Sequence, residues 1–213
     1  MTTFFTSDLH IGHKLVSGIR GFGWPKTARL REWDYVEIGL HDATIANNWD
    51  SVIGEDDEVW ILGDLSINSG PHVAEWIEKR PGRKHLVSGN HDKSHTALFP
   101  KYAEAKVAEW APYFESIQDE ATLEIGGKIV TLSHFPYWSW GDGPDTRGDR
   151  EPGFRPRYPK VRPPEGKKTI LLHGHTHGLE RAHERSLHIG LDAWGLQLVP
   201  MSTVEGFLEM LGD

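Results

Sequence analysis

The sequence predicts an α/β fold, and two observations support this class. Short apolar runs typical of buried strands alternate with longer segments that have the apolar spacing of amphipathic helices. Five of the apolar runs are also followed at once by a short polar motif. Because open α/β sheets bind their ligands at the carboxyl ends of the strands, these motifs are expected to meet at one edge. The five runs are residues 3–6, 59–62, 85–87, 129–132 and 169–172.

The first half of the chain is expected to alternate a loop, a helix, a strand and a second helix. Residues 14–24 are rich in glycine and aromatic side chains, which predicts a loop. Thr27 can cap a helix that runs to about Trp49, since apolar residues recur along this stretch at helical spacing. Residues 59–62 are continuously apolar, as in a strand covered on both faces. Proline in the first turn favours a helix at residues 71–79.

The second half is expected to contain more strands. Residues 83–88 predict one of them, and residues 115–125 and 128–132 predict a hairpin, because the two glycines between them supply positive φ. Residues 186–191 predict a further strand. Ser202 and Glu205 form a capping box that would open a last short helix.

The length of the chain fits one domain that covers residues 1–213 and can bury a substantial core. Within this domain, a stretch at about residues 136–167 is rich in Pro, Gly, Arg and Asp and shows no apolar periodicity. The composition predicts a long loop, and loops of this length in compact domains are usually functional or disordered.

Composition also excludes several classes of function. The chain has no cysteine, so disulfides, zinc–thiolate sites and thiol nucleophiles are excluded. The net charge of −8 argues against binding of extended nucleic acid over a broad basic face. The first predicted strand begins at about Thr3, and no apolar run approaches the roughly 20 residues that span a bilayer. We therefore expect a cytoplasmic protein without a membrane partner.

The polar motifs are rich in groups that bind divalent metal ions. A carboxylate can bridge two cations, and Asp64 is the candidate bridge because it stands alone at a strand end after a glycine. The amide oxygen of Asn90 is a hard, neutral ligand, and a mixed set with carboxylates and imidazoles favours Mn, Fe, Zn or Co. Two cations about 3.5–4 Å apart suit phosphoester hydrolysis, because they neutralise the phosphate and activate water. The motifs are Asp8-Leu9-His10, Gly63-Asp64, Gly89-Asn90-His91-Asp92, Ser133-His134 and Gly174-His175-Thr176-His177.

The order of these motifs resembles that of the calcineurin-like metallophosphoesterases, above all their small prokaryotic and phage members. The resemblance implies a four-layer α/β/β/α sandwich and two divalent ions, with manganese as the first choice. It implies that His91 protonates the leaving oxygen or stabilises the transition state, that Asp92 orients His91, and that a metal-bridging hydroxide attacks phosphorus. It assigns the first metal to Asp8, His10, Asp64 and His177, and the second to Asp64, Asn90, His134 and His175.

Departures from related subfamilies narrow the expected function. Protein Ser/Thr phosphatases of this superfamily have Glu where this chain has Asp92, and lipid A precursor hydrolases tend to have Arg at His91. The remaining pattern is similar to class III cyclic nucleotide phosphodiesterases. We therefore expect a phosphodiesterase for small substrates, with 2′,3′- or 3′,5′-cyclic nucleotides as leading candidates. A phosphomonoesterase and a nuclease are the alternatives, and a binding scaffold without metals is the least favoured, because the ligand set is complete.

The sequence leaves the roles of several other residues open. His13 fits a substrate contact and an exposed loop position equally well. His173 is expected to pack or to make a supporting hydrogen bond rather than to bind metal. Tyr137, Trp138 and Trp140 follow His134 and could stack a nucleobase, although a hydrophobic plug that anchors the long loop is the favoured interpretation.

Overall fold

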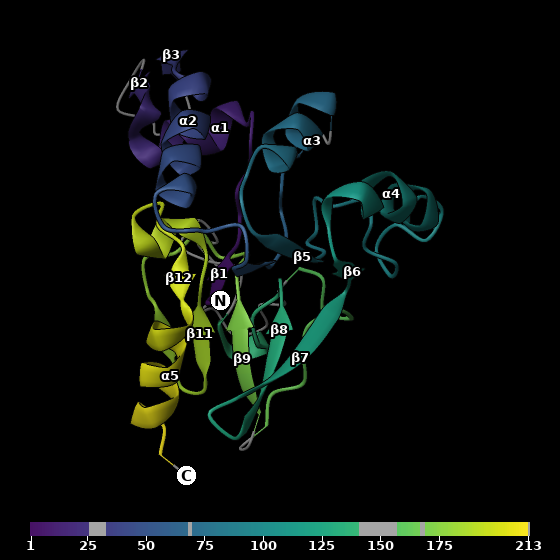
Figure 1. Ribbon diagram of the computed structural model, residues 1–213, viewed down its shortest axis with the longest axis vertical. Helices are drawn as coiled ribbons and strands as arrows, with labels where there is room; N and C mark the ends of the chain where they lie inside the picture. The colour runs from purple at the N-terminus through teal and green to yellow at the C-terminus, as the bar shows by residue number, and fades with distance from the viewer. Residues whose placement is uncertain (26–32, 68–69, 141–156, 167–168, 213) are drawn as a thin grey trace.

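The computed structural model describes residues 1–25, 33–67, 70–140, 157–166 and 169–212, and its framework is a pair of five-stranded sheets (Figure 1). In the first sheet four strands run parallel, and the two-residue edge strand β12 runs antiparallel to β1. The order of the first sheet is β12 (Val199–Pro200), β1 (Thr3–Thr6), β4 (Glu58–Ile61), β5 (Arg83–Val87) and β6 (Ser116–Gln118).

The second sheet is mixed. Its three central strands are parallel to one another, and an antiparallel strand flanks them on each side. Its order is β10 (Ala182–His183), β11 (Ser186–His188), β9 (Ile170–His173), β8 (Lys128–Ser133) and β7 (Glu120–Ile125).

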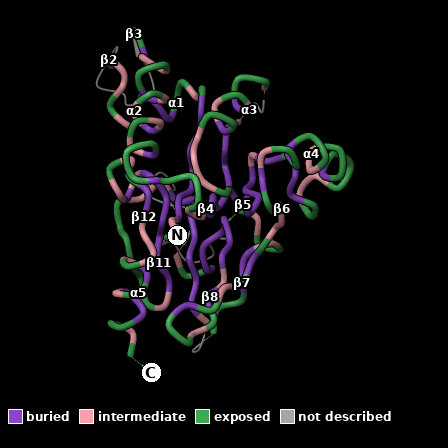
Figure 2. Tube along the Cα trace, in the orientation of Figure 1, coloured by how far each residue is buried: buried purple, intermediate pink, exposed green. Residues whose placement is uncertain are grey.

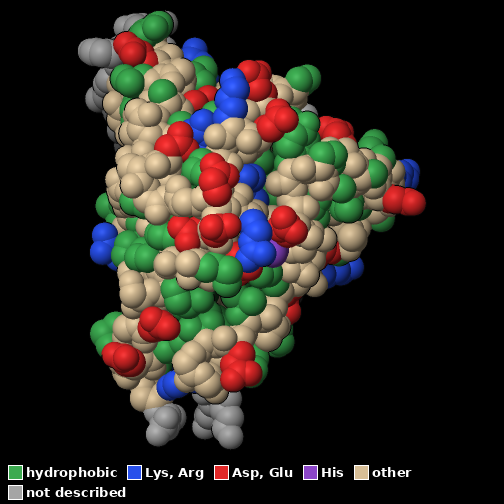
Figure 3. Space-filling view, viewed as in Figure 1, with side chains coloured by type: hydrophobic (Ala, Val, Ile, Leu, Met, Phe, Trp, Pro, Cys, Tyr) green, Lys and Arg blue, Asp and Glu red, His purple; other side chains and the backbone are tan. Residues whose placement is uncertain are grey.

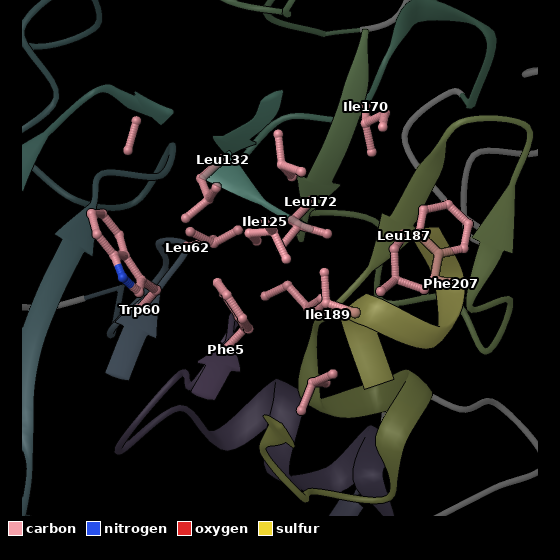
Figure 4. Packing of buried hydrophobic residues seen from close by; sticks show 14 of the residues in the cluster. Phe5, Trp60, Leu62, Ile125, Leu132, Ile170, Leu172, Leu187, Ile189 and Phe207 are labelled. Carbon is pink, nitrogen blue, oxygen red and sulfur yellow. The ribbon is translucent and has the colours of Figure 1, made fainter. Parts of the chain in front are cut away.

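One hydrophobic core fills the space between the two sheets. Trp60 of β4 and Leu62, the residue just after β4, belong to this core together with Leu132 of β8 and Leu172 of β9 (Figure 4). Phe207 of α5 (Met201–Met210) packs into the same cluster beside the second sheet. The strands that carry these side chains form the buried centre of the molecule (Figure 2).

A second core lies on the other face of the first sheet. Val59 and Ile61 of β4 point into it, together with Trp49 of α2 (Ile38–Asp50) and Ile77 of α3 (Pro71–Glu78). The layers therefore follow the order helix, sheet, sheet, helix, and the predicted α/β/β/α sandwich is confirmed. A further helix, α4 (Ala103–Trp110), was not predicted and contributes Trp110 to this core.

The predicted helix from Thr27 to Trp49 is wrong over its first part. Residues Trp33–Val36 form strand β3, which pairs with β2 (Gly23–Pro25), and α2 starts only at Ile38. Aromatic and β-branched residues favour a strand where a partner strand is at hand, and β2 supplies that partner. Thr27 lies outside the described residues.

The loop predicted over residues 14–24 is also wrong in part, because it holds a short helix and a π-helical turn. They are α1 (Lys14–Ser17) and η1 (Gly18–Phe22), which lead into β2.

The expected hairpin arm at residues 115–125 is divided between the two sheets. Residues up to Gln118 pair with β5 of the first sheet, and residues from Glu120 pair with β8 of the second. Only β7 and β8 form the predicted hairpin, and Asp119 stands at the crossing point, where its carboxylate accepts the backbone N–H of Thr96 at 3.0 Å.

The end of the chain differs in detail from the expectation. The strand predicted at residues 186–191 ends at His188, and a 3₁₀ turn, η4 (Leu191–Trp194), follows. Helix α5 begins at Met201, after Pro200, and has no side-chain cap. The capping box predicted at Ser202 is therefore wrong, because Ser202 lies inside the first turn of the helix rather than before it.

Only the two ends of the predicted long loop belong to the described residues. Residues 141–156 lie outside them, as do most of the arginines of the loop. At the start of the loop Tyr137 is buried, and Arg162 near its other end donates to the carbonyl oxygens of Pro136 and Tyr137 at 3.3 and 3.2 Å. The two described ends are thus tied together. Among the described helices none is long and apolar enough to cross a membrane.

Candidate metal centre

The five polar motifs converge at the carboxyl ends of β1, β4, β5, β8 and β9, as predicted. Backbone hydrogen bonds join the loops that carry them: Asp8 N–H donates to the Gly63 carbonyl at 3.0 Å, and His10 N–H donates to the Asp64 carbonyl at 3.0 Å. Gly174 N–H donates to the His134 carbonyl at 3.1 Å, which ties β9 to β8. All seven predicted ligands are brought together, and six of them are buried, namely Asp8, His10, Asp64, Asn90, His134 and His175.

One half of the site consists of Asp8, His10 and His177. The Nε2 atoms of the two imidazoles are 3.1 Å apart, and Asp8 Oδ1 lies 3.7 Å from His177 Nε2 and 4.0 Å from His10 Nε2. Two nitrogen ligands that each lie about 2.1 Å from one cation, at roughly a right angle, are separated by about 3 Å. The spacing of the imidazoles therefore fits a shared metal ion.

The other half consists of Asn90, His134 and His175. Asn90 Oδ1 lies 2.9 Å from His134 Nε2 and 2.8 Å from His175 Nδ1, and the two nitrogens are 3.2 Å apart. His134 Nδ1 lies 2.8 Å from the carbonyl oxygen of Leu62, which can only accept, so Nδ1 carries the proton. When the His134 imidazole carries its proton on Nδ1 alone, Nε2 turns a lone pair toward the Asn90 oxygen, and a cation between these two acceptors would satisfy both.

Asp64 stands between the halves. Its Oδ2 lies 3.6 Å from His10 Nε2 on one side and 3.6 Å from His134 Nε2 on the other. Burial raises the pKa of Asp64 to about 7, against the favourable charge of His134 and with further repulsion from Asp92 and Asp8. A buried carboxylate in this position fits a cation that neutralises it. The ligand atoms form two overlapping groups within 4.8 Å: Asp8, His10 and His177, and Asp8, Asp64 and His134.

The backbone of the site is strained. Five of the seven predicted ligands have left-handed φ, a conformation that costs non-glycine residues free energy and persists where the surroundings enforce it. Strain of this kind clusters at functional sites because it aims side chains that regular structure would turn elsewhere. The five values are 59° for Asp8, 48° for His10, 55° for Asp64, 73° for His175 and 52° for His177.

Gly63 permits the close approach of two of these loops. Its φ is +86°, and a Cβ there would lie 2.6 Å from the backbone nitrogen of Gly89.

We expect Gly63→Ala to lower the free energy of unfolding by about 1–3 kcal/mol and to weaken metal binding, because the two loops must move apart to make room for the methyl group. Gly206→Ala in α5 is the matched control, since a Cβ there meets nothing within 4 Å and alanine should leave stability unchanged or raise it. Chemical denaturation of both variants tests this, and equal effects would contradict it.

The carboxylate of Asp92 contacts the main chain of two ligand-bearing loops. Its carboxylate accepts the backbone N–H groups of Asp64 at 2.7 Å, Gly89 at 2.8 Å and Leu65 at 3.2 Å. In the described structure it makes no hydrogen bond to the imidazole of His91, so the interactions do not support the expected orienting role. Asp92 instead ties the loop after β4 to the loop after β5, which carry Asp64 and Asn90.

His91 lies at the open side of the site. Its side chain is 37% exposed, and its Nε2 lies 3.9 Å from Asp64 Oδ2. Burial, followed by the positive charge of His134 and His13, lowers the pKa of His91 to about 4. Without substrate its imidazole is therefore neutral at pH 7 and carries one N–H group. The negative charge of a bound phosphate would raise the pKa again, so that the imidazole could donate a hydrogen bond or, once protonated, a proton.

The residues whose roles the sequence left open lie either at the edge of the site or in the packed interior. His13 is partly buried, and the centre of its ring is 5.5 Å from that of His10, so it borders the site. His173 is fully buried, stacks on His188 at 5.3 Å and meets the edge of Trp140 at 4.4 Å, in agreement with the packing role that was expected. Trp138 is 46% exposed.

Sequence reasoning missed two charged residues behind the site, Arg20 and Asp192. Asp192 Oδ2 accepts the Nδ1–H of His177 at 2.9 Å and pairs with Arg20 at 2.7 Å. A signal for Asp192 is present in the sequence, because Gly190-Leu191-Asp192 follows a buried strand much as Gly63-Asp64 does. Arg20 has no such signal, since it lies in a stretch whose composition predicts a loop.

Comparisons with known proteins agree with this geometry. Residues 35–191 match the model of the calcineurin-like phosphoesterase superfamily domain. The chain belongs to the calcineurin-like phosphoesterase superfamily. Membership in this superfamily indicates hydrolysis of phosphoesters with the help of divalent metal ions, in line with the clustered Asp and His side chains.

Two curated relatives cover nearly the whole chain. Gene 66 protein of Mycobacterium phage L5 is 42% identical over 207 residues, which are 91% of this chain and 87% of that protein. Gene 66 protein of Mycobacterium phage D29 is 38% identical over 226 residues, which are 99% of this chain and 96% of that protein. The crystal structure of a protein of unknown function from Aquifex aeolicus has a TM-score of 0.63 at 21% identity, covers 97% of this chain and 98% of its own, and shows the shared fold.

Proposed function

We propose that this chain is a dinuclear metal-dependent phosphodiesterase that acts on small phosphodiesters, with cyclic nucleotides as the leading substrates. One observation carries the proposal: Asp64 Oδ2 lies 3.6 Å from an imidazole nitrogen of each half of the site. A carboxylate placed between two sets of ligands can bind one cation with each oxygen or share one oxygen between both, and this is the arrangement that two-metal hydrolysis requires.

The residues fit two divalent ions in the following way. Asp8, His10 and His177 would hold the first ion, Asn90, His134 and His175 the second, and Asp64 would bind both. When bound, the two ions supply charge for the phosphate oxygens and lower the pKa of a water molecule. Manganese is the first candidate, and Fe, Zn and Co also suit this mixture of oxygen and nitrogen donors.

His91 is proposed to act on the substrate itself. Its backbone N–H donates to Asp64 Oδ1 at 2.9 Å, which fixes the main chain of His91 beside the proposed bridge, while the imidazole remains free to point into the opening. There it would donate a proton or a hydrogen bond to the leaving oxygen, which carries increasing negative charge as the P–O bond breaks. Asp92 would not contact the substrate. It would hold in place the loops after β4 and β5, which carry Asp64 and Asn90.

A small substrate is favoured over extended nucleic acid. A nuclease needs a continuous basic track for the strand. The face in Figure 3 instead shows acidic and basic side chains interspersed, and the chain as a whole carries a net charge of −8.

The experiment that tests the proposal is hydrolysis of bis(p-nitrophenyl) phosphate beside p-nitrophenyl phosphate, with manganese added and after chelation, together with metal analysis. We expect turnover that depends on manganese, favours the diester and accompanies two bound ions per chain. A preference for the monoester would instead make the protein a phosphomonoesterase, and a protein that binds no metal and cleaves neither compound would contradict the proposal. Cyclic nucleotides are then compared under the same conditions.

A further inference from the structure

A buried arginine–aspartate pair lies behind the metal centre and includes none of the proposed ligands. The Arg20 side chain is 3% exposed and that of Asp192 is 10% exposed. Arg20 Nε donates to Asp192 Oδ1 at 3.0 Å and Arg20 Nη2 donates to Asp192 Oδ2 at 2.7 Å. Two parallel bonds of this kind fix both side chains in orientation as well as in distance.

Asp192 also determines how His177 faces the site. Its Oδ2 accepts the Nδ1–H of His177 at 2.9 Å. In a neutral imidazole the proton on Nδ1 leaves a lone pair on Nε2, and Nε2 is the atom that lies 3.1 Å from His10 Nε2 and 3.7 Å from Asp8 Oδ1. A carboxylate in this position behind a metal-binding histidine fixes its tautomer and its ring orientation.

Arg20 holds the strained first motif as well. Its Nη2 donates to the carbonyl oxygen of Asp8 at 2.7 Å, and its Nη1 donates to the carbonyl oxygen of Leu9 at 3.3 Å. Asp8 and His10 have left-handed φ values of 59° and 48°, which persist only if neighbouring contacts enforce them, and these two bonds hold the two carbonyl groups that lie between them.

A fifth contact links Arg20 to helix α2. Its Nη1 lies 3.2 Å from His41 Nε2, and His41 Nδ1 lies 2.8 Å from Asp42 Oδ1. Asp42 Oδ2 accepts the backbone N–H of Gly12 at 3.0 Å, so the chain of contacts returns to the turn that follows the first motif. A guanidinium has five N–H donors, and the five acceptors around Arg20 match them.

We propose that Arg20 is a positioning residue of the metal centre, which acts through Asp192 on the tautomer of His177 and through the main chain on Asp8. The proposal rests on the assignment of His177 and Asp8 as ligands of the first metal ion.

The alternative is an ion pair that only stabilises the fold, and a double variant separates the two. Arg20→Met with Asp192→Leu replaces the buried pair by apolar side chains of similar size, a change that is often tolerated by the fold. Arg80→Met with Asp50→Leu is the control. Arg80 Nη1 donates to Asp50 Oδ2 at a distance of 2.7 Å, and in the described part of the chain neither residue contacts a proposed metal ligand. Arg20→Lys is a milder second variant, since lysine keeps the charge but cannot make the two parallel bonds.

The first measurement is the tautomer of His177 in the metal-free protein, by long-range ¹H–¹⁵N correlation at alkaline pH. We expect the Nδ1–H form in the wild type and in the control, and a mixture of tautomers in the Arg20/Asp192 double variant. The second measurement is titration with Mn²⁺. The double variant should lose about 10–100-fold in affinity at one site, the range found for supporting partners of metal ligands, and Arg20→Lys should lose less.

An unchanged tautomer and unchanged Mn²⁺ affinity in folded variants would overturn the proposal and leave a structural ion pair. The double variant is checked for folding by circular dichroism, and if it does not fold, Arg20→Lys decides by the same two measurements. A wild type that binds no Mn²⁺ would contradict the proposed function. The tautomer of His177 would still respond to Asp192 in that case, so the two failures are distinguishable.

Discussion

Replacement of His91 by alanine is expected to lower turnover by about 10²–10⁴-fold while both metal ions stay bound, because a general acid typically contributes that much. The backbone N–H of residue 91, which donates to Asp64 Oδ1 at 2.9 Å, is kept in alanine. The imidazole is 37% exposed and its Nε2 lies 3.9 Å from Asp64 Oδ2, so its removal should leave the buried ligands in place.

The dependence on the leaving group makes this test sharper. If His91 protonates the leaving oxygen, the loss should be smaller for p-nitrophenol, which leaves readily without a proton, than for an alkyl alcohol. Turnover of aryl and alkyl diesters is measured together with manganese content, and His183→Ala, at an exposed position in β10, serves as control. Near-normal turnover of both diesters would remove His91 from the mechanism, and loss of manganese would make it a ligand instead.

The metal centre was predictable because each of its motifs is local. A glycine and a polar residue after an apolar strand, as in Gly63-Asp64 or Gly174-His175, reveal both the strand and the ligand in a few residues. Parallel strands then bring their ends together without any further information from the sequence. The hairpin of β7 and β8 was expected on equally local grounds, whereas the two-sheet sandwich was implied only by the resemblance to the family.

The elements that the sequence did not predict depend on partners far along the chain. Arg20 becomes important only because the fold places it against Asp192, across 172 residues. The strand Trp33–Val36 exists because it pairs with β2, and periodicity alone does not distinguish it from the first turns of a helix. Asp92 was expected to orient its neighbour His91, but in the fold its carboxylate accepts three backbone N–H groups, those of Asp64, Leu65 and Gly89.

Asp64→Asn is expected to abolish the binding of at least one metal ion and to reduce turnover more than His91→Ala does. Asparagine is nearly isosteric and can still accept the backbone N–H of His91, but its amide has one oxygen and no charge, so it cannot serve two cations. Metal analysis of the purified variant and titration with Mn²⁺ measure the loss. Two bound ions in this variant would refute the bridging role.

The same substitution should make the metal-free protein more stable at neutral and higher pH. The unfolded chain releases the Asp64 proton near 3.8, whereas burial keeps it on the folded chain up to about 7. Between these values the unfolded state binds fewer protons, so the contribution of Asp64 to the free energy of unfolding falls as pH rises. Asparagine has no proton to lose. Its advantage over aspartate should therefore grow from about pH 4 to pH 7 and then level off, in denaturation experiments with chelator present.

Addition of Mn²⁺ should reverse the order of stability. Metal ions bind the folded wild type and not the unfolded chain, so they stabilise it by mass action, and they neutralise the carboxylate that destabilised the metal-free form. The variant lacks that carboxylate and should gain little. If the wild type is less stable than Asp64→Asn without metal and more stable with it, the buried carboxylate of Asp64 destabilises the metal-free protein and contributes to metal binding. Equal responses of both proteins to Mn²⁺ would show that the ions bind elsewhere.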